Sequence, residues 1–307
     1  VAAPCRGDAA TMNNSPNLWA KLESAALVEG EMPATQIDAT PWYVRAMIGI
    51  GGWLAALFLI ASIGAGLAFV MRSAAAAIAS GAVICAVAAL LLWIKREQAF
   101  LAQFALALAI AGQGLLAWGI AERVHVSLAP AFLTFAALEL ALVVVIAHPV
   151  HRVWSAFLCV VAIAAALFDW GVSPLMPGIV AIAFAAIVLN EARLARYAAV
   201  VQPATAGIAL ALVVITAVLA YGVPDLLSSV RESKGAANVG AALGAIALIG
   251  STVALLRRHG IAASRIGWAG IAGIVALAAA AWRVPGLAAA ITLMLVAFGA
   301  GRPALTG

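Results

Sequence analysis

Pro41-Trp42-Tyr43-Val44-Arg45, followed by the run from Ala46 to Val70, decides the fold class. The first five residues combine two aromatic rings with a cation, which is typical of a membrane–water interface. From Ala46 to Val70 no residue carries a charge. About 20 apolar residues in an α-helix cross a hydrocarbon core of about 30 Å, so this run predicts a transmembrane helix with some tilt.

The composition of the whole chain supports the same conclusion. Of the 307 residues, 66% are hydrophobic and only 9% are charged. Soluble domains carry about 25% charged residues, so a water-soluble globule is excluded. The composition predicts an all-α, polytopic transmembrane helical bundle. The net charge of +5 comes from Lys and Arg that lie mainly in short loops, where membrane orientation explains them better than nucleic-acid binding.

Apolar runs separated by short charged segments repeat along the chain, and we count about ten of them. The predicted spans are 46–70, 74–94, 99–120, 128–147, 153–168, 178–189, 203–222, 238–256, 266–282 and 285–300. The sixth run, 178–189, is at the short end of what can cross a bilayer, and a start at Leu175 is an alternative.

The cations in the loops predict the orientation. With the N-terminus inside, the inner loops hold twelve cations: Arg6, Lys21, Arg45, Lys95, Arg96, Arg152, Arg193, Arg196, Arg257, Arg258, Arg265 and Arg302. The outer loops hold five: Arg72, Arg123, Arg231, Lys234 and Arg283. Because cytoplasmic loops are enriched in Lys and Arg, we expect both termini in the cytoplasm.

The chain divides into three parts by composition. Residues 1–40 are polar and contain no apolar core of the kind that a signal peptide needs, but a short amphipathic helix is predicted at 18–28. Residues 41–302 form the predicted transmembrane domain, and residues 303–307 are the C-terminal end. Three cysteines, Cys5, Cys85 and Cys159, form no even disulfide framework.

Several blocks resemble a known family. They are Leu18-Trp19, Pro41 to Arg45, Gly52 to Phe58, Phe100 to Gln103, Ala111 to Gly119, Leu138 to Leu140, and His151-Arg152. Together they are similar to domain of unknown function 4401, an uncharacterised bacterial membrane family. The resemblance covers about residues 16 to 302 and implies a multi-span protein of the bacterial inner (plasma) membrane, with no activity to carry over. Members of that family usually continue further, so we expect the chain to be shortened at its C-terminus.

Glu139 is the most informative single residue, because it lies deep within the run from Leu128 to Ala147. A carboxylate there costs at least ~2.5 kcal/mol, so it normally faces protein or a wet cavity. One interpretation is a proton or cation site. The other is a neutral acid hydrogen-bonded to a neighbouring helix, which we favour because no other span holds a deeply buried acid. Gln113 lies at a similar depth, so Glu139 and Gln113 are predicted to form a buried polar pair.

The remaining polar residues indicate no chemistry. His148 and His151 flank Pro149, which disfavours a helix at His148, and no Cys or carboxylate lies nearby, so we predict an interfacial turn rather than a metal site. Asp169 precedes Trp170 and Gly171 and is predicted to cap or turn. No phosphate-binding loop, nucleophile–base pair or dinucleotide fingerprint is present. We therefore expect no catalytic residue, no cofactor and no metal ion.

Two functions follow from the sequence. The first is a non-enzymatic inner-membrane protein that is a component of an envelope assembly, with the lipid bilayer and a small membrane protein encoded nearby as partners and no nucleic acid. The alternative is a small-molecule secondary transporter, since about ten spans also describe the drug/metabolite transporters, which are built from two inverted repeats. Residues 46–170 and 175–300 show no convincing repeat, and Glu139 has no counterpart in the second half, so the first function is favoured.

Overall fold

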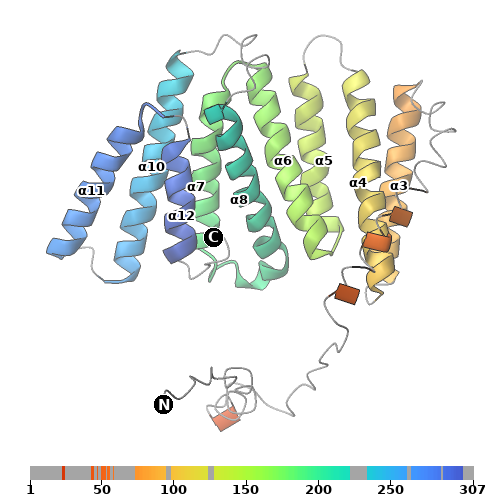
Figure 1. The fold of residues 1–307 in the computed structure, drawn as a ribbon, viewed down its shortest axis with the longest axis horizontal. Coiled ribbons are helices and arrows are strands. Elements are labelled where there is room, and N and C mark those ends of the chain that lie inside the picture. The colour runs from red at the N-terminus through yellow and green to blue at the C-terminus, as the bar shows by residue number, and fades with distance from the viewer. Residues whose placement is uncertain are drawn as a thin grey trace, which may run out of the picture. The chain divides into compact units, whose positions relative to one another are not determined.

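The structure is a computed structural model that describes residues 73–94, 98–123, 128–221, 234–260, 264–284 and 286–299, together with isolated positions between 23 and 58. These residues are all α-helical or in short connections (Figure 1). The helices are α3 (Ala74–Ile94), α4 (Ala99–Glu122), α5 (Ala129–Val145), α6 (Pro149–Asp169), α7 (Met176–Leu189), α8 (Ala198–Tyr221), α10 (Lys234–Arg258), α11 (Arg265–Ala281) and α12 (Leu287–Gly299), with 3₁₀ turns η1 (Ser173–Leu175) and η2 (Ala195–Tyr197). The helices predicted at 18–28 and 46–70 lie largely outside the described residues.

Within this described part, five helical segments are long and apolar enough to cross a membrane. They are Ala74–Ile94, Phe100–Glu122, Pro149–Asp169, Ala195–Ala220 and Gly235–Arg258. Shorter apolar helices cover Ala129–Val145, Ser173–Leu189, Arg265–Ala281 and Leu287–Gly299. The all-α fold and the multi-pass membrane class are confirmed, whereas the number of ten spans and their orientation stay predictions.

Of two prolines that the sequence suggested as boundaries, Pro149 starts a helix and Pro203 lies inside one. α6 begins at Pro149, where the ring occupies the first helical position and its missing N–H costs nothing. α8 begins at Ala198 and includes Pro203, which was predicted to start the span. A proline there leaves the carbonyl of the residue four positions earlier, Ala199, without its helical donor.

Arg152 supplies the missing donor. Its Nη1 donates to the carbonyl oxygen of Ala199 at 2.7 Å, and its Nε donates to the carbonyl oxygen of Val143 at 3.0 Å. Val143 belongs to the last turn of α5, whose carbonyls also lack intrahelical donors. The side chain is buried, so one guanidinium joins α5, α6 and α8 by satisfying two carbonyls that would otherwise cost free energy.

Close packing joins α3 to α4. A Cβ added at Gly81 would lie 2.7 Å from the carbonyl oxygen of Gly112, and one at Gly112 would lie 2.7 Å from Cys85 Sγ. Small residues allow such an approach of two backbones, which is how membrane helices commonly associate. α4 meets α5 over a much smaller surface than it meets α3, whereas α5 packs extensively on α6, and α6 on α8. The junction between α4 and α5 is therefore the sparsely packed one.

A second core surrounds α7. Phe184 of α7, Leu212 of α8 and Val296 of α12 have no exposed surface, and α10 completes the cluster. α11 packs mainly against α10 and to a lesser extent against α12. Its surface is exposed on more than one side, since Ile266 is 78% exposed and Trp268, two residues later, is 65% exposed. Most of the surface of α11 is therefore available to lipid or to a partner.

Candidate functional site

Four buried polar side chains meet where α4, α5 and α6 face one another. Gln113 comes from α4, Glu139 from α5, and His151 and Ser155 from α6. His151 and Ser155 lie four residues apart, which places them on one face of their helix. Gln113 is 1% exposed and the other three are 0% exposed. We refer to these four residues as the α4–α6 cluster.

Gln113 is the centre of the cluster. Its Nε2 lies 3.1 Å from Glu139 Oε2, 3.1 Å from Ser155 Oγ and 3.3 Å from His151 Nε2. The other ring nitrogen, His151 Nδ1, lies 3.3 Å from Ser155 Oγ. One amide thus links a carboxyl group, an imidazole and a hydroxyl across three helices.

Two oxygens of the cluster have no hydrogen-bond partner among the described residues. They are Gln113 Oε1 and Glu139 Oε1, and both are fully buried. The neighbouring cation, Arg152, donates instead to Val143 and Ala199. Glu139 therefore has the amide of Gln113 and the hydroxyl of Ser155, and no described cation, as partners of its carboxyl group.

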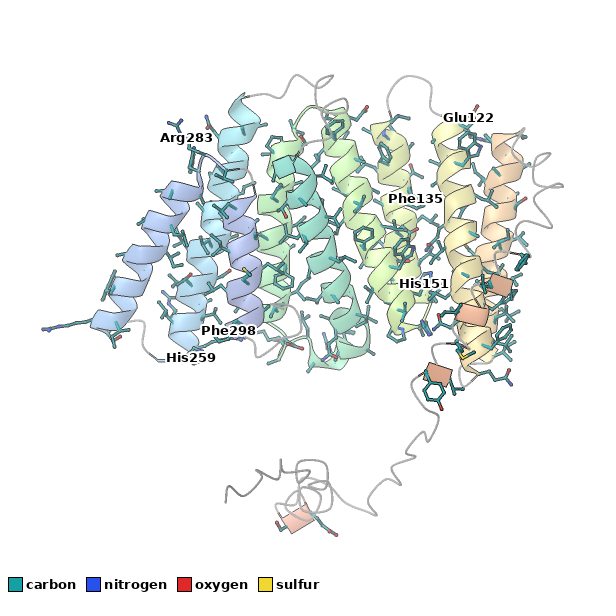
Figure 2. The ribbon with its side chains drawn as sticks, in the orientation of Figure 1. Glu122, Phe135, His151, His259, Arg283 and Phe298 are labelled. Carbon is teal, nitrogen blue, oxygen red and sulfur yellow. The ribbon has the colours of Figure 1, made fainter. Side chains whose placement is uncertain are left out.

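The cluster lies nearer one end of the helices than the other. Glu139 is six residues before the end of α5, or about 9 Å at 1.5 Å per residue, and His151 belongs to the first turn of α6. Figure 2 shows His151 toward this end and Glu122 at the opposite end of the bundle. Because the α5–α6 connection is predicted to be cytoplasmic, the cluster is expected in the inner half of the membrane.

The structure brings the predicted pair, Glu139 and Gln113, into contact. It also adds two residues that the sequence did not assign to a site. The prediction of an interfacial turn is wrong for His151, which is helical and has no exposed surface, while His148 is the N-cap residue of α6. The spacing of His151 and Ser155 after an N1 proline was the available signal. Asp169 does act as a cap, since its Oδ2 accepts from the N–H of Ala129, the first residue of α5.

Two cavities elsewhere in the described helices are unconnected with this cluster. One of about 380 Å³ is lined by α7, α10, α11 and α12, mostly by small residues, with Arg283 at its edge. The other, of about 260 Å³, lies among α6, α7 and α8 and is almost entirely apolar. Neither is lined by a residue of the α4–α6 cluster. Among the residues described, no group of three His, Cys, Asp or Glu could hold a metal ion.

A comparison with protein families finds a match for this chain. A family model described as "Domain of unknown function (DUF4401)" matches residues 41–307, which is most of the chain. The chain belongs to the DUF4401 family. No curated protein and no solved structure matches it. The DUF4401 domain contains the whole α4–α6 cluster.

Proposed function

We propose that this DUF4401 protein is a non-enzymatic, multi-pass protein of the bacterial inner membrane that serves as a component of an envelope assembly. One observation carries the proposal. The buried polar groups of α4, α5 and α6 contact one another and border neither cavity. Such groups hold helices together, because a buried donor or acceptor left without a partner costs about 1–3 kcal/mol.

The proposal includes ten spans with both termini in the cytoplasm. Cations at three connections support this orientation. Arg152 is the fourth residue of α6, Arg196 lies between α7 and α8, and Arg258 ends α10. Arg258 also donates through Nη2 to the carbonyl oxygen of Leu189, at the end of α7. An excess of Lys and Arg marks the cytoplasmic side, and Arg258 is also favourable as a cation at the C-terminus of α10.

α11 offers the surface on which a partner would dock. The helix is peripheral, and Ile266 and Trp268 are two of its exposed side chains. The partners we propose are the lipid bilayer and a small membrane protein encoded nearby, with no nucleic acid. A single apolar helix of such a protein fits an exposed apolar helix face, because close packing drives helix association in membranes.

Photo-crosslinking in native membranes tests this function. A photoreactive residue at Trp268 should give one discrete protein adduct, identified as a small membrane protein whose gene lies beside this one. Leu140 on α5 is 61% exposed and serves as the matched control, for which lipid adducts are expected. Lipid adducts alone at both positions would contradict the assembly role.

A second function, a secondary transporter, is favoured by one observation. The α4–α6 cluster contains a carboxyl group and an imidazole inside the membrane, and such groups are common in proton relays of transporters. A proton-coupled transporter in liposomes should give a current after a pH jump on a solid-supported membrane, and Glu139→Gln should abolish it. An assembly component gives no current with either protein.

A further inference from the structure

The contacts of Gln113 exceed what its amide group can donate. A primary amide nitrogen carries two hydrogens, yet Gln113 Nε2 lies within hydrogen-bond distance of three atoms. At the same time Gln113 Oε1, a strong acceptor, is buried without a partner. An amide oxygen and an amide nitrogen occupy nearly identical volumes, so turning the group by 180° exchanges donor and acceptor without moving a neighbour.

In the first orientation the amide donates. The two N–H groups of Gln113 bond to Glu139 Oε2 and to His151 Nε2. The ring hydrogen of His151 is then on Nδ1 and is donated to Ser155 Oγ. A carboxylate accepts hydrogen bonds only, so this arrangement fits an ionised Glu139.

In the second orientation the amide accepts. Its oxygen has two lone pairs, which fit two donors: the O–H of a protonated Glu139 and the Nε2–H of His151. The hydroxyl of Ser155 then donates to His151 Nδ1, which has lost its hydrogen. The three hydrogen bonds named for the first orientation have reversed their direction, and this arrangement requires a neutral Glu139.

We propose that the α4–α6 cluster is a proton-binding site, in which Glu139 takes up and releases one proton while the amide of Gln113 turns to match its charge. Uptake adds one proton to a carboxylate oxygen of Glu139 and neutralises it. The His151 ring loses a proton at Nδ1 and gains one at Nε2, so its charge does not change. The net reaction is the binding of one proton, which is independent of the assembly role.

Few other charged or titratable groups face the cluster from the helices packed around it. α3 contributes Cys85, whose Sγ donates to the carbonyl of Ala109. α6 contributes Cys159, one turn beyond Ser155, together with Arg152 and the N-cap residue His148. Arg152 is held by carbonyls of α5 and α8. His151 is the member closest to a helix end, so protons are expected to exchange from that end.

Infrared difference spectroscopy of the full-length protein in lipid tests the proposal. When the pH is raised from about 4 to about 9, the range over which exposed and buried carboxyl groups of Glu titrate, one buried carboxylic-acid band should be replaced by a carboxylate band. The band should be absent in Glu139→Gln and unchanged in Glu122→Gln, since Glu122 is exposed at the far end of α4. If the infrared signal of the natural protein stays constant over this range, the cluster binds no proton. That result alone would overturn the proposal, without a variant.

The turning of the amide has its own readout. In solid-state ¹⁵N spectra, the ring hydrogen of His151 should move from Nδ1 to Nε2 as Glu139 becomes protonated, with the signal assigned by its loss in His151→Asn. Gln113→Met keeps the length of the side chain but donates no hydrogen bond and accepts only weakly. In that variant Glu139 should still titrate, but the tautomer of His151 should no longer change with the protonation state of Glu139. A tautomer that follows Glu139 equally well in Gln113→Met would overturn the role of the amide.

Discussion

Arg152 Nη1 donates a hydrogen bond to the carbonyl oxygen of Ala199 at 2.7 Å, and that carbonyl is the one that Pro203 leaves without a helical donor. A side chain of α6 thus replaces a backbone N–H of α8. The replacement explains why a proline is tolerated inside α8, and why a guanidinium is buried beside a membrane span.

Arg152→Met should therefore destabilise the protein by about 1.5–3 kcal/mol, the value of a hydrogen bond from a charged donor. Pro203→Ala restores an N–H for Ala199, so it should recover about 1 kcal/mol in the Arg152→Met protein and much less in the natural one. Unfolding in mixed detergent–dodecyl sulfate micelles measures both. Strictly additive effects would show that the two residues are not coupled.

Glu139→Gln should leave the free energy of unfolding nearly unchanged, because an amide can replace the neutral acid opposite Gln113. Glu139→Leu should cost on the order of 1 kcal/mol, a typical value for one interhelical hydrogen bond in a membrane. Thermal unfolding in detergent compares the three proteins. Equal damage by Gln and Leu would mean that the ionised carboxylate is the form that stabilises the bundle.

Gly112→Ala should destabilise the α3–α4 pair by about 1–3 kcal/mol, because the new methyl group would meet Cys85 Sγ and the carbonyl oxygen of Gly81. Gly114 is the matched control in the same helix, since a Cβ there has no atom within 4 Å. Gly114→Ala should be neutral or stabilising by up to about 1 kcal/mol. The unfolding midpoints of the two variants are compared. A loss of stability in Gly112→Ala alone indicates close packing, whereas an equal loss in both would indicate a general effect of replacing glycine by alanine in this helix.

The two ends of α10 test the proposed orientation. Alkaline phosphatase fused after Gly235, at the beginning of α10, should be active, because that end is predicted to face outward. The same enzyme fused after Gly260, beyond the end of α10, should be inactive. The opposite pattern would reverse the orientation, and activity at both ends would mean that the number of spans is wrong.

The sequence predicts the class of fold because a long run of residues without charge indicates a membrane helix whatever its detailed packing. It predicts the contact of Gln113 with Glu139 because helical rise fixes depth along an axis. It does not predict His151 and Ser155 as part of the cluster, since that depends on which faces of α4 and α5 meet α6. α4 and α5 are apolar on all sides and give no stripe from which a rotation could be read. The predicted start of a span at Pro203 is also wrong, because Arg152 donates to the carbonyl of Ala199 that Pro203 leaves without a helical donor. This hydrogen bond joins residues that are far apart in the sequence, so the sequence near Pro203 does not indicate it.

The outer face of α11 has a consequence for the membrane around it. Trp268 near its beginning and Trp282 at its end are both exposed, and they are 14 residues apart, or about 21 Å along the helix axis. Tryptophan is enriched at the headgroup boundary, so in the proposed ten-span arrangement these rings mark a hydrocarbon layer thinner than the usual ~30 Å. Lipids beside α11 must shorten or tilt to match it, which favours bilayers with short acyl chains. A partner helix docked there has to be equally short, because a longer one would push apolar residues into water.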